Sequence, residues 1–127
     1  MRVLNLEDNV YKHNDICKVL NNGEFGEVNI ECARNLEEGL EKIEEQNSKE
    51  ASYDLIITDM WYPQKAHEED TNSGEILINK AIDRGWNIPI ILCSSVRYRI
   101  PGILGSVHYS KNEDWENELV TLIKKLR

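Results

Sequence analysis

Two short apolar runs of the chain end in carboxylates. The run Leu55–Thr58 is followed by Asp59, and the run Val3–Leu6 is followed by Glu7 and Asp8. Such runs predict buried strands of a parallel sheet, and open α/β folds place their ligand sites at the carboxyl edge of that sheet. We therefore expect the three acids at one edge, where they repel one another unless a cation lies between them. Oxygen ligands favour Mg²⁺ or a similar hard ion, which often binds together with a phosphate.

Hydrophobic periodicity predicts strands that alternate with helices along the whole chain. Five strands separated by helices indicate a doubly wound parallel sheet of the α/β class. At 127 residues the chain is long enough to bury its own core, and we interpret residues 1–127 as one domain. The expected strands include Arg2–Leu6, Glu27–Ala33, Asp54–Asp59 and Ile88–Cys93, and the expected helices run from Asn9 to about Leu20, from Asn35 onward, from about Gly74 to Gly85 and from about Glu113 to Leu126.

The first helix has a predicted inner face. Val10, Ile16, Cys17 and Leu20 recur at helical spacing, which predicts that they face the core. Further along, the polar segment from Asn47 to Ser52 is expected to form a connection between a helix and the next strand.

Composition restricts the possible classes of protein. The net charge of −8 argues against direct binding of nucleic acid, because phosphate contacts need a basic face. No apolar stretch is long enough to span a bilayer, and the N-terminus lacks a signal-peptide pattern. Cys17, Cys32 and Cys93 are widely spaced and odd in number, which indicates buried thiols in a reducing compartment and no zinc site. We expect a cytoplasmic protein with no membrane partner.

Four segments, in this order, carry a resemblance to a known family. They are Leu6–Asn9, Asp54–Asp59 with Pro63 four residues later, Pro89–Ser95, and Tyr109–Lys111. With these segments the whole chain resembles the receiver domain of bacterial two-component response regulators. The resemblance implies a flavodoxin-like fold with strand order 2-1-3-4-5.

The resemblance also implies a role for each acid. Asp59 would be the phosphoacceptor, Asp8 would bind Mg²⁺ directly, and Glu7 would hold the ion through water. The backbone carbonyl of Trp61 would be a further metal ligand. The residue type at position 59 suits this role, since a carboxylate can attack a phosphoryl group and form a mixed anhydride.

The remaining implied roles belong to residues near the last two strands. Ser94 would bond the phosphoryl group and signal its arrival, and Lys111 would pair with a phosphoryl oxygen. The aromatic switch position of the family is His108 here. Its neighbour Tyr109 should point to the opposite side of the strand.

Three features depart from the family pattern. The loop Met60–Ser73 is longer than usual, and we interpret it either as a solvated insertion or as a lid or partner contact. The segment Val96–Gly105 is short and broken by Pro101–Gly102, so we expect a shortened or irregular fourth helix. Asn112 follows Lys111 where the family has a cis proline, and we expect a trans bond because a cis bond before a non-proline residue is costly.

The resulting hypothesis is a phosphoacceptor receiver that is not itself an enzyme. It would take a phosphoryl group from the phosphohistidine of a sensor histidine kinase or phosphotransfer protein and signal to a further, unidentified protein. The alternative is a pseudo-receiver that acts as an interaction module without phosphorylation. The acids, hydroxyl and lysine favour the first hypothesis, and the broken fourth helix favours the second. Two interpretations of Trp61 also stay open: it shields the acyl phosphate from water, or it packs away against Tyr62 or the third helix.

Overall fold

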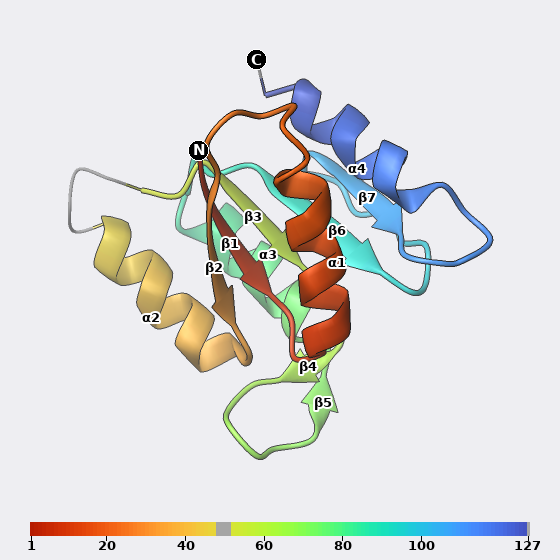
Figure 1. Cartoon of the computed structure of the whole chain (residues 1–127). Coiled ribbons are helices and arrows are strands. Elements are labelled where there is room, and N and C mark those ends of the chain that lie inside the picture. Colours follow the sequence, from red (N-terminus) through yellow and green to blue (C-terminus); the bar gives the residue numbers. More distant parts are fainter. Residues whose placement is uncertain (48–51, 127) are drawn as a thin grey trace.

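The computed structural model describes residues 1–47 and 52–126 and contains a five-stranded parallel sheet (Figure 1). The strands are β1 (Arg2–Leu6), β2 (Asn29–Ala33), β3 (Leu55–Thr58), β6 (Ile90–Ser94) and β7 (Gly105–His108). Their order in the sheet is β2-β1-β3-β6-β7, which is 2-1-3-4-5 when these five strands are counted along the chain. The predicted doubly wound, flavodoxin-like α/β fold is confirmed.

Helices cover both faces of this sheet. They are α1 (Val10–Leu20), α2 (Leu36–Asn47), α3 (Ser73–Asp83) and α4 (Trp115–Lys124). One face is covered by α1 and α4 and the other by α2 and α3, and each pair closes its own apolar core (Figure 1). Among the described helices, none combines the length and the apolar character needed to cross a membrane.

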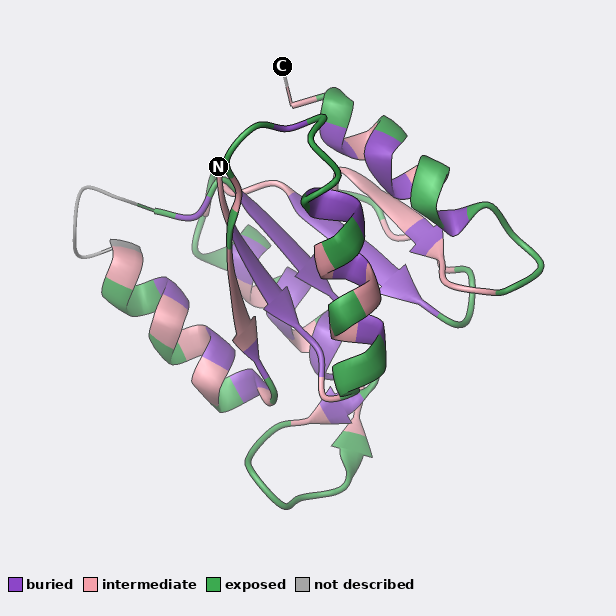
Figure 2. Ribbon diagram, in the orientation of Figure 1, coloured by how far each residue is buried: buried purple, intermediate pink, exposed green. Residues whose placement is uncertain are grey.

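The inner strands are buried on both faces, as their apolar sequences predict. Every residue of β3 and β6 is buried, and in β1 only Arg2 is partly exposed (Figure 2). The edge strand β2 is mostly half-exposed. Because β1 and β3 pair in parallel with Leu6 opposite Thr58, the residues that follow them, Glu7 and Asp59, leave the sheet side by side.

The first helix begins where the sequence predicts, but its inner face differs. The Asn9 Oδ1 atom accepts hydrogen bonds from the backbone N–H of Tyr11 at 3.0 Å and of Lys12 at 3.2 Å, a cap that is typically worth about 1 kcal/mol. Val10 is 51% exposed, whereas Lys12 is only 6% exposed. The prediction for Val10 is therefore wrong, because the helix is phased so that a lysine occupies the first place of the inner stripe. The buried residues of this helix are Lys12, Ile16, Val19 and Leu20.

Two connections at the carboxyl edge have their own structure. The segment Met60–Ser73 contains a two-stranded antiparallel ribbon of β4 (Tyr62–Pro63) and β5 (Asp70–Thr71) and ends in the first residue of α3. Residues 95–104, all of them described, form bends, a turn and irregular backbone, so the segment expected to hold a shortened or irregular fourth helix is irregular and contains no helix. Most of the predicted connection Asn47–Ser52 lies outside the described residues.

Candidate functional site

The three predicted acids meet at the carboxyl edge of the sheet. One carboxylate oxygen of each of Glu7, Asp8 and Asp59 lies within 4.8 Å of the other two. They line a pocket of about 570 Å³. Glu7 is buried. Three carboxylate oxygens this close together fit a hard divalent cation such as Mg²⁺.

A lysine of α1 lies inside this acid cluster. The Lys12 Nζ atom is 2.9 Å from Glu7 Oε1 and 3.3 Å from Asp59 Oδ1. It also donates a hydrogen bond of 2.6 Å to the backbone carbonyl of Cys93, at the end of β6. The ammonium group therefore connects the ends of three adjacent strands, β1, β3 and β6.

Burial and charge together shape the electrostatics of the pocket. Burial raises the pKa of Glu7 to about 7; the charge of Lys12 opposes this rise, and that of Asp59 adds to it. Burial also raises the pKa of Asp8, and the next cause is the carboxylate of Asp70. Burial alone lowers the pKa of Lys12, but Glu7 and Asp59 outweigh it and the pKa is raised. The lysine is thus a permanent cation between acids.

Backbone contacts fix the position of Asp59. Its N–H donates to the carbonyl of Leu6 at 3.1 Å, and its Oδ1 atom accepts from the N–H of Met60 at 2.7 Å. The N–H of Gly74, in the first turn of α3, donates to the Met60 carbonyl at 3.0 Å. A side chain at Gly74 would clash with the backbone of Asp59 and Met60, so only glycine permits this approach. Oδ2 of Asp59 has no hydrogen bond to any described residue.

A fourth carboxylate, Asp70, comes from the β4–β5 ribbon. It lines the pocket beside Asp8, and the charge of its carboxylate contributes to the raised pKa of Asp8. The hydroxyl of Ser73, the first residue of α3, donates to the carbonyl of Tyr62 in β4 at 2.5 Å. The long segment after β3 is therefore folded onto the site.

The predicted residues near β6 and β7 are less closely associated with the pocket. Ser94 is 2% exposed, and its Oγ atom lies 3.5 Å from the N–H of Val96. Lys111 is exposed and is absent from the residues that line the pocket. The described residues contain no cis peptide bond, so the bond after Lys111 is trans, as predicted.

His108 and Tyr109 point to opposite sides, as expected from the alternation of a strand. A ring nitrogen of His108, Nε2, is 2.9 Å from the carbonyl of Ser95, and its Nδ1 atom is 3.5 Å from Glu113. The Tyr109 hydroxyl instead donates to Asp15 of α1 at 2.6 Å. The tyrosine ring, not the histidine, therefore lines the pocket.

Trp61 forms part of the pocket rim. Its side chain is 50% exposed, and its Nε1 atom donates a hydrogen bond of 2.8 Å to the hydroxyl of Tyr98. The indole therefore joins the end of β3 to the irregular segment 95–104. The predicted shielding of Asp59 stays a prediction, as does the predicted role of the Trp61 carbonyl.

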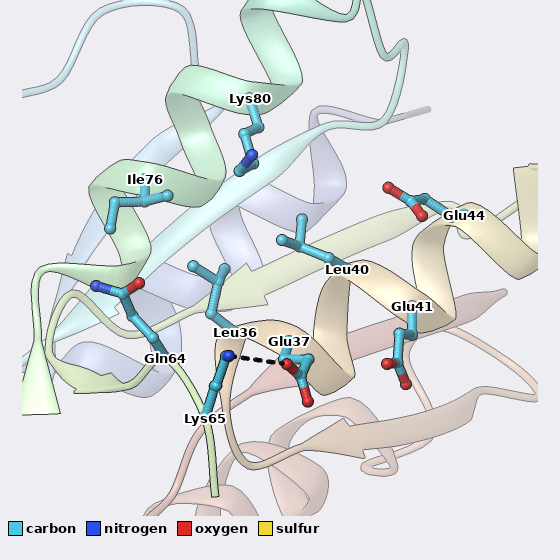
Figure 3. A pocket seen from close by; sticks show the side chains of 9 residues that line it. All are labelled: Leu36, Glu37, Leu40, Glu41, Glu44, Gln64, Lys65, Ile76 and Lys80. Atoms are coloured by element: carbon cyan, nitrogen blue, oxygen red, sulfur yellow. Dashed lines mark ion pairs between the residues drawn. The ribbon is translucent and has the colours of Figure 1, made fainter. Parts of the chain in front are cut away.

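A second hollow, of about 310 Å³, lies between α2 and α3 (Figure 3). Its floor is apolar, and Leu36, Leu40 and Ile76 contribute to it. Acids of α2 and two lysines surround this floor, and Lys65 pairs with Glu37 at 4.0 Å. The groove gathers no cluster of metal-ligating groups in the described residues, so the acid pocket is the candidate site.

Comparison of the sequence with known proteins finds one relative of limited coverage. No family model matches the chain. The uncharacterized protein y4jS of Sinorhizobium fredii is 31% identical over 90 residues, which make up 71% of this chain. The match spans only 21% of the length of that protein, so its activity as a whole does not transfer.

Solved structures resemble the chain over nearly its whole length. A response regulator receiver protein from Pseudoalteromonas atlantica has a TM-score of 0.71 at 19% identity, with 99% of this chain and 96% of that chain covered. The chain has the receiver-domain fold. Two further receivers are the phosphorylated cyanobacterial phytochrome response regulator RcpA (TM-score 0.69, 18% identity, 98% and 89% covered) and the Mn²⁺-bound response regulator Rcp1 (TM-score 0.67, 15% identity, 98% and 88% covered).

Two residues of the acid pocket were missed by the sequence analysis. Lys12 had a signal, because it stands four residues before Ile16 on the inner stripe of α1, and a lysine on an apolar stripe needs a charged partner. Asp70 had no usable signal. It is one of several acids in a polar segment, and only the pairing of β4 with β5 brings it to the pocket.

Proposed function

We propose that the chain is a phosphoacceptor receiver of two-component signalling in which Asp59 takes the phosphoryl group in a Mg²⁺-dependent reaction. The observation that supports this most is the position of Asp59: it lies beside Glu7 and Asp8 in an open pocket, and its Oδ2 atom has no hydrogen bond to a described residue. A carboxylate held in this way can act as a nucleophile.

The transfer needs positioning and neutralisation of charge more than covalent chemistry from the protein. Oδ2 of Asp59 attacks phosphorus, a mixed anhydride forms, and the bond from phosphorus to the donor breaks, with its electron pair leaving on the donor atom. Backbone contacts hold the attacking carboxylate in place, and Asp8 and Glu7 would hold the metal. Bound Mg²⁺ would supply positive charge to the phosphoryl oxygens.

The expected phosphoryl donor is the phosphohistidine of a sensor histidine kinase or of a phosphotransfer protein. Two receivers of the same fold support this reaction class, since one was solved phosphorylated and another with Mn²⁺ bound. The chain would then signal to a further protein in the cytoplasm. The chain would act as the phosphoryl acceptor and not as an enzyme in its own right.

The pseudo-receiver alternative rests on a specific observation. Lys111 is exposed, the Ser94 hydroxyl lies near the backbone of Val96, and no helix follows β6 within residues 95–104. A module that only binds a partner would tolerate these features. It would have no need, however, for a buried Glu7 and a half-buried Asp8 beside an open carboxylate oxygen of Asp59.

Mass measurement after incubation with acetyl phosphate or phosphoramidate and Mg²⁺ tests the proposal. Wild type should gain one phosphoryl mass, and Asp59→Asn should gain none. Asp83→Asn, which changes an exposed acid at the end of α3, is the matched control and should gain the same mass as wild type. An equal gain in wild type and Asp59→Asn would remove Asp59 from the reaction, and no gain in wild type would favour the pseudo-receiver.

A further inference from the structure

The lysine in the acid pocket is Lys12 of α1, whereas the sequence analysis expected Lys111, which follows β7. Lys12 belongs to the first turn of α1, and its ammonium lies between Glu7 and Asp59. Side chains of a helix lean toward its N-terminus, and α1 begins at the carboxyl edge of the sheet. A lysine in the first turn can therefore reach the strand ends.

The three hydrogens of this ammonium have three oxygens within reach. They are Glu7 Oε1 at 2.9 Å, Asp59 Oδ1 at 3.3 Å and the Cys93 carbonyl at 2.6 Å. The carbonyl contact anchors the group to the sheet. The contact with Asp59 is the longest and is made to the residue that would receive the phosphoryl group.

At the end of β7 the ring of Tyr109, and not the side chain of Lys111, faces the Lys12 ammonium. The Tyr109 ring centre lies 5.4 Å from Lys12 Nζ, and its hydroxyl is bound to Asp15. Trp115 packs against the same ring edge-to-face at 4.9 Å. These contacts keep Tyr109 in place, and the turn that follows, in which the N–H of Asn112 bonds to Ser110, leaves Lys111 exposed.

We infer that Lys12, and not Lys111, is the catalytic lysine that pairs with a phosphoryl oxygen during transfer to Asp59. The inference rests on the proposed function. The site thus draws its cation from the first helix, and Tyr109 acts as a positioning residue that holds the ammonium from the side of the last strand.

Lys12 remains protonated throughout the step. The carboxylate of Asp59 forms a bond to phosphorus, the bond from phosphorus to the donor breaks, and acetate leaves as the anion when acetyl phosphate is the donor. As the phosphoryl oxygens arrive, one ammonium hydrogen turns from Asp59 to the nearest of them. A preorganised cation of this kind stabilises the charge of the transition state without first having to be ordered.

The same position gives Lys12 a second effect. The positive charge of Lys12 offsets part of the negative charge of Glu7 and Asp59 and repels Mg²⁺. Lys12 should therefore weaken metal binding before phosphorylation. Removing the charge should therefore slow transfer and strengthen Mg²⁺ binding. A lysine with only a structural role would not separate these two properties, because its loss would damage both.

The experiment compares Lys12→Met, Lys111→Met and Lys18→Met, where Lys18 is an exposed lysine of the same helix. Phosphorylation by phosphoramidate is followed by mass, and Mg²⁺ affinity by tryptophan fluorescence. For Lys12→Met we expect a transfer rate lower by about a hundredfold, comparable to loss of one stabilising donor, with a higher Mg²⁺ affinity. Lys111→Met and Lys18→Met should match wild type in both measurements.

Other outcomes have distinct meanings. A normal rate in Lys12→Met, a slow Lys111→Met, or a loss of both rate and Mg²⁺ affinity in Lys12→Met would overturn the role of Lys12 and leave the proposed function intact. A wild type that gains no phosphoryl group would overturn the proposed function, and this role with it. If circular dichroism shows that Lys12→Met is unfolded, NMR of the wild-type protein tests the role of Lys12 in its place. There the Lys12 ammonium signal, identified by its contact with the Tyr109 ring, should shift on phosphorylation, and an unchanged signal would overturn the role.

Discussion

The carboxyl edge of the sheet has two halves that are built in different ways. On the side of β1 and β3, Glu7 and Asp59 are buried or half-buried, and Lys12 pairs with both. On the side of β6 and β7, Lys111 is exposed, and the segment that follows Ser94 consists of turns. The first half forms a charged cluster around Lys12, whereas the charged contacts of the second half, Arg97 with Glu118 and His108 with Glu113, lie outside the acid pocket.

The difference between the two halves depends on how many residues separate each side chain from the end of its strand. Glu7 and Asp59 directly follow paired residues of parallel strands, so the register alone brings them together. Lys111 stands three residues beyond the end of β7, and its position depends on a turn. Residues that directly follow a strand are thus positioned by the sheet, while more distant ones depend on local loop structure.

The largest expected effect concerns Mg²⁺ binding by the first half. Asp8→Ala should weaken Mg²⁺ binding by more than about a hundredfold, because loss of a direct ligand should exceed the 10- to 100-fold loss seen for outer contacts. Glu7→Gln should weaken binding less if Glu7 acts through water. Calorimetric titration of each variant gives the affinities.

Ser94→Ala is the control from the second half and should bind Mg²⁺ like wild type. If Ser94→Ala weakened binding as much as Asp8→Ala, the two halves would be one unit and the comparison between them would fail.

Two glycines allow the next comparison, which concerns stability. A methyl group at Gly74 would meet the backbone of Asp59 and Met60, which cannot move without disturbing β3. A methyl group at Gly105, the first residue of β7, would meet only the end of the Leu122 side chain, at 2.6 Å. We expect Gly74→Ala to lower the free energy of unfolding by about 2–3 kcal/mol, within the range for overpacking, and Gly105→Ala by about 1 kcal/mol.

Urea denaturation measures both values. Equal losses in the two variants would show that the Asp59 backbone is no more rigid than the Leu122 side chain, contrary to the contrast between the two halves.

The sequence predicted the fold and the acids for one physical reason. Apolar runs predict inner strands, and the acids directly follow them, so a correct strand prediction also places Glu7, Asp8 and Asp59. Lys12 was missed because the expected inner face of α1 began at Val10, where periodicity alone favours a valine over a lysine. Burial of the lysine depends on the acids it meets, which come from two different strands. The position of Asp70 could not be predicted, since it depends on pairing within the β4–β5 ribbon.

A smaller effect is expected for the lifetime of phospho-Asp59. Trp61 lines the pocket, and its bond to Tyr98 keeps the indole beside the site. Attack by water needs an in-line path, and a large apolar side chain obstructs it. Trp61→Asn should shorten the lifetime roughly three- to tenfold by admitting water, with unchanged Mg²⁺ affinity. Decay is followed by mass after removal of the donor.

Tyr98→Phe tests whether the position of the Trp61 indole matters separately from its size. It keeps the ring but removes the acceptor of the indole hydrogen bond, so it should shorten the lifetime less than Trp61→Asn. If Trp61→Asn decays no faster than wild type, the indole does not shield the acyl phosphate, and the proposed function is unaffected.

The smallest effect concerns Asp8, an acid of the charged half. Glu7 is paired with Lys12, whereas Asp8 forms no ion pair with a described residue and faces Asp59 and Asp70. Without metal, Asp8→Asn should raise the free energy of unfolding by a few tenths of a kcal/mol, a small gain because solvent screens this partly exposed group. The pKa of Asp8 is raised in the folded protein, so its ionisation costs stability, and that cost disappears as the pH falls below the pKa of the unfolded chain. The gain from Asp8→Asn in urea denaturation should accordingly be present at neutral pH and vanish in acid. A gain that persists in acid would show that the asparagine stabilises the fold by some means other than relief of charge repulsion.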